Sequence, residues 1–131
     1  MKILGIDYGD KKIGLALGDS TVQLAVPLEV ISNRGIQTID VLCKMVRNED
    51  FELIVVGVPL TTGDHHSAEQ LEKTRAFIKI LSSAVLVPVI EEDESYTTAE
   101  SLRLQKEEGA QAPEDALAAM LIVQSYLNQI I

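Results

Sequence analysis

The feature that most constrains the fold is a helical pattern that leads into a short, uninterrupted apolar run, and this feature occurs twice. Apolar residues recur at helical spacing over residues 36–46, and the run Leu53–Val58 follows them. Helical spacing returns over residues 71–81 and leads to a second run at 85–90. A run without polar residues predicts a strand covered on both faces, and a helix between two such strands predicts a parallel crossover.

The N-terminal part of the chain predicts three more strands. Residues 2–7 form an apolar strand that ends in a turn at 8–10, and residues 13–17 form the second arm of a hairpin. Residues 25–31 supply a third strand. Pro27 predicts that this strand lies at a sheet edge or contains a bulge, because proline cannot donate to a central ladder.

The remaining signals are helical. Capping-box patterns at 67–70 and 97–100 each begin a helix, and the second of these helices is short and polar. Pro113 is expected as the first residue of a last helix that ends near Asn128. The predicted class is therefore α/β, with one mixed five-stranded sheet and helices on both faces. A chain of 131 residues has room for one core, so we expect a single domain over residues 1–131.

The charge balance argues against a partner held by positive protein charge alone. Eleven Lys and Arg residues against twenty Asp and Glu residues give a net charge of -9, the wrong sign for gripping phosphates. This argument weakens if several acids converge on divalent ions, which bring positive charge to the place where a phosphate must sit. We find no apolar run of the roughly 20 residues that span a bilayer and no basic leader, so we expect a cytoplasmic protein without a membrane partner.

The cysteine and the histidines predict no site of their own. Cys43 is the only cysteine and falls among apolar residues of a predicted helix, so a buried structural thiol is expected. His65 and His66 are adjacent in a predicted loop and would point in different directions, and no zinc-ligand spacing surrounds them. We expect them to be structural or to face solvent.

Two carboxylates stand where the pattern predicts packing. Asp7 ends an apolar strand beside the core, where an ionised carboxylate is costly unless it is paired or bound to metal. Its alternative role is to cap the turn that follows. Asp115 shares a helical stripe with Ala119 and Ile122, so a charge lies on the packing face. Its alternative role is to favour the positive end of the helix dipole.

A run of acids at residues 91–94 closes the predicted fifth strand. Such a run is ordinarily a solvated strand end. Chemistry gathers at sheet ends in α/β folds, however, and acids from two strand ends and one helix start are what a two-metal phosphodiesterase needs. Carboxylate oxygens favour Mg²⁺ or Mn²⁺ over zinc. The sequence thus predicts a magnesium or manganese site at one edge of the sheet.

Four short segments of the chain, taken in order, form one pattern. They are Gly5-Ile6-Asp7-Tyr8-Gly9 with Lys12-Ile13-Gly14-Leu15-Ala16, Val56-Gly57-Val58-Pro59-Leu60, Asp93-Glu94 with Thr97-Thr98-Ala99, and Asp115-Ala116-Leu117-Ala118-Ala119 with Gln124-Ser125-Tyr126-Leu127. This pattern resembles the YqgF/RuvX family of ribonuclease H-like proteins. The resemblance implies a ribonuclease H-like fold and a metal-dependent nuclease that matures the 5′ end of the 16S ribosomal RNA precursor. An older assignment of the family is Holliday junction resolvase.

The resemblance also implies roles for individual residues. It makes Asp7, Glu94 and Asp115 the catalytic carboxylates, and these three with Asp93 the candidate metal ligands. Glu94 is preferred over Asp93 because it lies nearer the following helix and successive strand residues face opposite sides. Four further residues are expected to contact the substrate phosphates: Lys11, Lys12, Thr97 and Thr98. The two threonines also suit helix capping.

The chain departs from the family pattern in ways that weaken its grip on a substrate. Ser95 stands where the family usually has an arginine that can fork around a phosphate, Lys12 replaces another arginine, and residues 107–114 are acidic or neutral where the family is basic. Three functions stay open. They are a nuclease of structured precursor RNA, a resolvase of branched DNA, and a non-catalytic RNA- or protein-binding module. Only the resolvase requires a symmetric homodimer, and the sequence leaves monomer and homodimer open.

Overall fold

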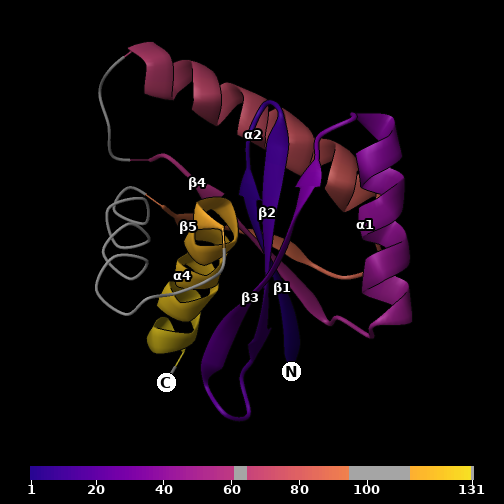
Figure 1. Ribbon diagram of the computed structural model, residues 1–131, viewed down its shortest axis with the longest axis vertical. Helices are drawn as coiled ribbons and strands as arrows, with labels where there is room; N and C mark the ends of the chain where they lie inside the picture. Colours follow the sequence, from indigo (N-terminus) through magenta and orange to yellow (C-terminus); the bar gives the residue numbers. More distant parts are fainter. Residues whose placement is uncertain (61–64, 95–112, 131) are drawn as a thin grey trace.

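The computed structural model describes residues 1–60, 65–94 and 113–130 (Figure 1). The predicted polar helix that begins at 97–100 lies outside these residues. The chain alternates strands and helices in the order β1 (Lys2–Tyr8), β2 (Lys12–Asp19), β3 (Leu24–Ser32), α1 (Ile36–Asn48), β4 (Leu53–Val58), α2 (His65–Ala84), β5 (Val89–Asp93) and α4 (Glu114–Gln129).

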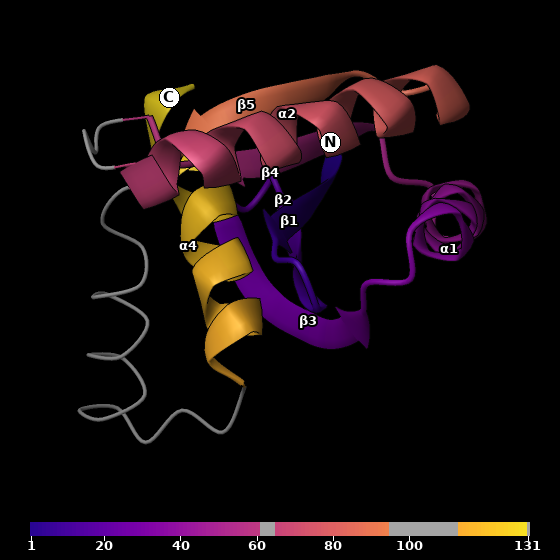
Figure 2. The ribbon, with the colours of Figure 1, turned by 90° about the horizontal axis from the view of Figure 1, so that it is seen from above.

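The strands form one mixed sheet in the order β3-β2-β1-β4-β5. The hairpin pairs β1 with β2 and β2 with β3 are antiparallel, and the crossover pairs β1 with β4 and β4 with β5 are parallel. In Figure 2, α4 lies on one side of the sheet and α1 and α2 lie on the other. The predicted five-stranded sheet with helices on both faces is confirmed.

Pro27 fulfils both of the alternatives that the sequence left open. It lies in β3, which is an edge strand, and the ladder with β2 shifts register there. Leu15 pairs with Glu29 while the next residue, Ala16, pairs with Pro27, so Leu28 is the extra residue of a bulge. The proline thus costs the sheet no central hydrogen bond.

Three predicted boundaries were wrong. The fifth strand is Val89–Asp93 and not 85–90, because the ladder with β4 begins where Ile54 pairs with Val89, and Leu86 is fully exposed in the turn before it. Helix α2 is already formed at His65, so the predicted loop around the two histidines is a helix. Pro113 precedes α4 with an extended ψ of 149° and is its N-cap, not its first helical residue.

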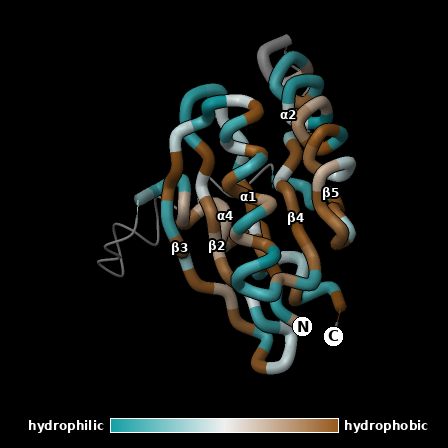
Figure 3. Tube along the Cα trace, turned by 90° about the vertical axis from the view of Figure 1, so that its right-hand side faces the viewer, coloured by the Kyte–Doolittle hydropathy of each residue, from teal (hydrophilic) through white to brown (hydrophobic). Residues whose placement is uncertain are grey.

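The sheet separates two hydrophobic clusters, and Figure 3 shows how strongly apolar residues dominate the central strands. On one face, large aliphatic side chains of the strands, such as Leu4 and Ile6, pack against α1 and α2. On the other face, Ile3 and Val55 pack against α4, which contributes Ala119 among others. The two faces therefore receive alternate residues of the same strands.

Glycines on the α4 face let this helix lie unusually close to the sheet. A Cβ atom on Gly14 would stand 2.0 Å from the carbonyl oxygen of Asp115, and one on Gly5 would stand 3.0 Å from that of Ala119. Real Cβ atoms do not approach a backbone atom as closely as 2.0 Å, so the Gly14 site accepts only hydrogen, whereas a Cβ on Gly5 would also stand 2.1 Å from the side chain of Val123 and would force it to move. Because Gly14 meets the first turn of α4, this contact fixes where that turn begins.

None of the helices that the structure describes is long and apolar enough to cross a membrane.

Candidate active site

Asp7 lies near the end of β1, on the face that α4 covers. Ile3 of the same strand packs in the α4 cluster, whereas Leu4 and Ile6 pack on the opposite face, so alternation directs Asp7 towards α4. Its partner across the ladder with β2 is Gly14. Because Gly14 has no side chain, the first turn of α4 comes down beside Asp7, whose carboxyl group is partly buried there.

Glu94 lies beside Asp7 but comes from the end of a different strand. It follows β5, and its backbone N–H donates to the carbonyl oxygen of Val58 at 3.0 Å. Its Oε2 atom would lie 2.6 Å from a Cβ on Gly57, so the carboxylate lies over that glycine on the α4 face. The carboxyl groups of Asp7 and Glu94 are hydrogen-bonded to each other. Two strand ends thus deliver two acids to one point.

Asp93 belongs to the other face of the sheet. Along β5, Glu91 pairs with Arg75 of α2 at 2.9 and 3.0 Å, and Glu92 accepts a hydrogen bond from Ser125 of α4 at 2.9 Å. The strand alternates, so Asp93 follows Glu91 towards α2. Of the two acids between which the sequence offered a choice, Glu94 is the one beside Asp7.

Burial and mutual repulsion make the pair hold a proton. The pKa of Asp7 is raised from 3.8 to about 9 by burial first, then by the charge of Glu94 and the hydrogen bond with it, and by the charges of Asp115 and Glu114. The pKa of Glu94 is raised by burial and by the charge of Asp93, although its bond with Asp7 opposes the shift. Asp7 therefore keeps its proton at neutral pH and donates a hydrogen bond to the Glu94 carboxylate.

Asp115 lies beside this pair without joining it. It is in the first turn of α4, and its charge acts on Asp7. Within residues 1–60, 65–94 and 113–130, no three Asp, Glu, His or Cys side chains are placed to hold a metal ion together. The close group is thus the pair Asp7 and Glu94, with Asp115 within electrostatic range.

A cavity of about 470 Å³ opens next to Asp115. Lys12 and Ser32 line it from β2 and β3, and Pro113 and Glu114 line it from the start of α4. Lys12 is exposed, as is Lys11 in the turn before it. Of the residues predicted to contact phosphate, the structure therefore brings Lys12 next to a candidate carboxylate. Thr97, Thr98 and the departure at Ser95 lie outside the described residues.

A family model described as "RuvX: Holliday junction resolvase" matches residues 1–129. The chain belongs to the RuvX family. A protein of Syntrophus aciditrophicus named "Putative pre-16S rRNA nuclease" is 38% identical, with 99% of this chain and 90% of the relative covered. A protein of the same name in Halothermothrix orenii is 34% identical over 98% of this chain and 95% of the relative.

Two solved structures show which fold the RuvX-family chain has. Thermus thermophilus RuvC in complex with a Holliday junction substrate matches with a TM-score of 0.68 and 16% identity, covering 99% of this chain and 96% of that one. The Fowlpox virus resolvase with Holliday junction DNA matches with a TM-score of 0.64 and 14% identity, covering 100% and 99%. The expected ribonuclease H-like fold is confirmed.

Sequence reasoning missed a buried acid next to the site of this RuvX-family chain. Glu92 is buried, and its carboxylate accepts hydrogen bonds from Ser125 at 2.9 Å and from Gln129 at 2.5 Å, both on α4. The four acids of 91–94 were treated as one run, although alternation along β5 assigns them to different faces. Ser125 and Gln129, two polar residues four apart on an otherwise apolar stripe of α4, are the sequence signal that could have indicated a buried polar partner such as Glu92.

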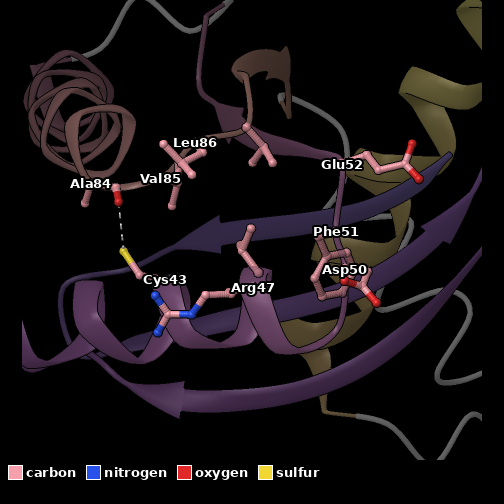
Figure 4. Close-up of a pocket in the computed structure, with 10 residues that line it drawn as sticks. Cys43, Arg47, Asp50, Phe51, Glu52, Ala84, Val85 and Leu86 are labelled. Carbon is pink, nitrogen blue, oxygen red and sulfur yellow. Dashed lines mark hydrogen bonds between the residues drawn. The ribbon is translucent and has the colours of Figure 1, made fainter.

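Cys43 does not take part in this site. It lines a cavity of about 390 Å³ near the starts of β4 and β5, at the other end of the sheet (Figure 4). Its thiol is partly buried, not fully buried as predicted, and lies 3.6 Å from the carbonyl oxygen of Ala84. Burial and the charge of Asp40 raise the pKa of Cys43, which disfavours the reactive thiolate.

Proposed function

We propose that this RuvX-family chain is a divalent-metal-dependent nuclease that hydrolyses phosphodiester bonds in the precursor of 16S ribosomal RNA in the cytoplasm. The observation that carries the proposal is the partly buried pair of Asp7 and Glu94, two acids brought together at the sheet end with a proton between them. The names of the relatives supply the substrate. Burying two adjacent acids costs free energy that uncharged side chains such as alanine or asparagine would not cost, so packing alone does not explain the pair.

The donor chemistry fits Mg²⁺ or Mn²⁺. Asp7 and Glu94 offer only carboxylate oxygens, which these ions prefer. The proton that the two carboxyl groups share neutralises one of their negative charges. A bound cation would neutralise that charge in its place, so metal and proton compete for the same oxygens. Asp7 and Glu94 would hold the ion, and Asp115 is a further carboxylate near it, whereas the predicted ligand Asp93 is directed to the other face of the sheet. When bound, the ion supplies positive charge to the phosphate and lowers the pKa of a bound water.

The chain's own residues prepare the site for a phosphate. Glycines at 14 and 57 keep side chains out of the space around the pair, and α4 shields it from bulk solvent on one side. The low local dielectric strengthens the attraction of the carboxylates for a cation. Lys12, exposed beside Asp115, adds a positive charge at the rim where a phosphate enters.

A resolvase of branched DNA is the second candidate, because the matching family model carries that description. It would need two copies of the site facing opposite strands, which a symmetric dimer supplies. A non-catalytic RNA- or protein-binding module is the third, and the net charge of -9 favours it.

Cleavage of two labelled substrates separates these functions. The full chain is incubated with precursor 16S ribosomal RNA and with a four-way DNA junction, each in Mg²⁺, in Mn²⁺ and in chelator. We expect the RNA to be cut only when a metal is present. Cutting of the junction alone by a dimer would replace the proposal with the resolvase. Binding without cutting of either substrate would replace it with the binding module.

A further inference from the structure

We propose that Arg34 forms a second phosphate-binding position, which holds the RNA backbone where it leaves the carboxylate site around the end of β3. The inference rests on the proposed function, because its ligand is the phosphodiester backbone of the same substrate. Arg34 precedes α1 and is exposed, 27 residues from Asp7 in sequence. Three observations support the proposal. Arg34 has no ion pair in the described residues, its loop is hydrogen-bonded to the turn before β2, and its cavity adjoins the cavity beside Asp115.

The cations of the chain divide into paired and unpaired ones. Each of four pairs with an acid within 4 Å, namely Lys2, Lys44, Lys73 and Arg75. In the part of the chain that the structure describes, five others have no such ion pair, namely Lys11, Lys12, Arg34, Arg47 and Lys79. Three of the five lie at the site end of the sheet, in the turn between β1 and β2 (Lys11), at the start of β2 (Lys12) and in the loop between β3 and α1 (Arg34). Cations without acidic partners retain their full charge for a phosphate.

Asn33 joins these two loops into one unit. Its side-chain Nδ2 donates to the carbonyl oxygen of Gly9 at 2.9 Å, and its backbone N–H donates to the carbonyl oxygen of Lys11 at 2.9 Å. The backbone N–H of Arg34 donates to Oγ1 of Thr38 at 2.7 Å. The backbones that carry Lys11 and Arg34 are therefore fixed relative to each other, while the arginine side chain stays exposed.

One acid in this unit is already paired with a lysine. Asp10 lies in the same turn as Lys11, and Lys73 of α2 pairs with it at 3.3 Å. The first turn of α1, which follows Arg34, contains no acidic residue. Residues 33–39 thus contain one charged side chain, that of Arg34, although the whole chain carries a net charge of -9.

Two cavities connect the surface around Arg34 with the carboxylates. The cavity of about 470 Å³ beside Asp115 is lined by Lys12, and a cavity of about 360 Å³ is lined by Arg34 and Gln37. Both are also lined by Ile31 and Ser32, so they adjoin at the end of β3. A strand entering beside Asp115 can pass Lys12 and reach Arg34, whose planar guanidinium forks around a phosphate.

The test compares Arg34→Gln with Arg47→Gln in the full chain. Both arginines are without an ion pair in the described residues. Arg34 precedes α1 and Arg47 lies in its last turn, so Arg47 is a matched control away from Asp7 and Glu94. Binding of a fluorescent single-stranded RNA from the precursor is measured in chelator over a salt series, and KM and kcat for its cleavage are measured in Mg²⁺. Equal melting temperatures of the two variants confirm intact folds.

We expect Arg34→Gln to weaken RNA binding roughly tenfold at about 0.1 M salt, with the slope of log K against log salt reduced by about 0.7. KM should rise with little change in kcat, and Arg47→Gln should match the parent. Equal binding by all three proteins overturns the inference while the nuclease stands, if the parent still cuts. Arg34-dependent binding without any cutting supports the inference and removes the catalytic proposal. A parent that neither binds nor cuts RNA overturns both, and stronger Arg34 dependence on a four-way DNA junction overturns the RNA assignment.

Discussion

The two faces of the sheet are built from alternate residues of the same strands, yet they differ in kind. The face towards α1 and α2 is filled by large aliphatic side chains such as Leu4, Ile6 and Ile54. The face towards α4 has glycines at the contact and ends in Asp7 and Glu94. Large side chains bury area and stabilise, whereas glycines bring backbone close and set positions. One face therefore supplies stability, and the other supplies the geometry of the proposed chemistry.

The largest loss of stability is expected from a methyl group placed between α4 and β2. Gly14→Ala puts a Cβ 2.0 Å from the carbonyl oxygen of Asp115, and backbone atoms cannot rotate away. We expect a loss of about 3 kcal/mol in the free energy of unfolding. On the opposite face, Ile54→Val should cost only about 1 kcal/mol. Denaturant unfolding measures both, and equal losses would mean that α4 is free to shift.

Removing one acid of the pair should abolish chemistry without unfolding the chain. Asp7→Asn keeps the shape of the side chain but removes a proposed ligand, so metal-dependent RNA cleavage should fall by more than about a hundredfold, or about 2.7 kcal/mol in barrier height. Asp115→Asn should act similarly. Asp10→Asn is the matched control, because Asp10 is exposed and paired with Lys73. Asp7→Asn activity within about threefold of the parent would reject Asp7 as essential.

Alanine substitutions at two neighbouring acids of β5 should differ in their cost to stability, because the two side chains lie on opposite faces of the sheet. Glu92→Ala leaves Ser125 and Gln129 of α4 without their acceptor at a buried place, and we expect it to cost about 2 kcal/mol of stability. Glu91→Ala breaks an exposed pair with Arg75 and should cost much less, because solvent screens it. Thermal unfolding of both variants checks this order. A larger loss from Glu91→Ala would contradict it.

Periodicity and residue type predicted most of the architecture. The apolar run Leu53–Val58, the apolar strand at residues 2–7 and the proline at 27 each predicted a local structure that the fold confirms. The run at 85–90 failed because Pro88 and the exposed Leu86 form a turn before the ladder begins at Val89. An apolar run shows that residues are buried more reliably than it shows where their hydrogen bonds start.

The candidate site was only partly predictable. Asp7 could be singled out because it is an acid after an apolar strand, and Glu94 because the family resemblance and strand alternation separate it from Asp93. The close approach of α4 over Gly14 and the bonds of Glu92 could not, because they depend on which helix crosses which strand. Arg34 carries no signal in sequence, since a lone arginine after a strand is ordinarily a solvated surface residue. Three-dimensional proximity to Lys12 distinguishes it.

The raised pKa of Asp7 predicts a smaller effect on stability against pH in chelator. Its folded pKa of about 9 exceeds the ordinary 3.8, so the folded state binds more protons than the unfolded state between these values. Stability should therefore fall as pH rises from about 6 to 8, by a fraction of the roughly 1.4 kcal/mol per pH unit that one fully linked proton gives. Asp7→Asn should flatten this slope. Chemical unfolding at a series of pH values measures it, and equal slopes for parent and variant would contradict the assignment.

The most direct test of the central claim, that Asp7 and Glu94 form a metal centre, is the melting temperature of Asp7→Asn relative to the parent in chelator and in excess Mg²⁺ at neutral pH. In chelator the variant should melt at or above the parent, because folding of the parent at neutral pH must protonate Asp7, whereas asparagine is neutral in both states. In Mg²⁺ the order should reverse, since an ion at about a hundredfold above its Kd adds about 2.7 kcal/mol to the parent alone. Parallel shifts in both solutions would make Asp7 a turn cap and contradict the account.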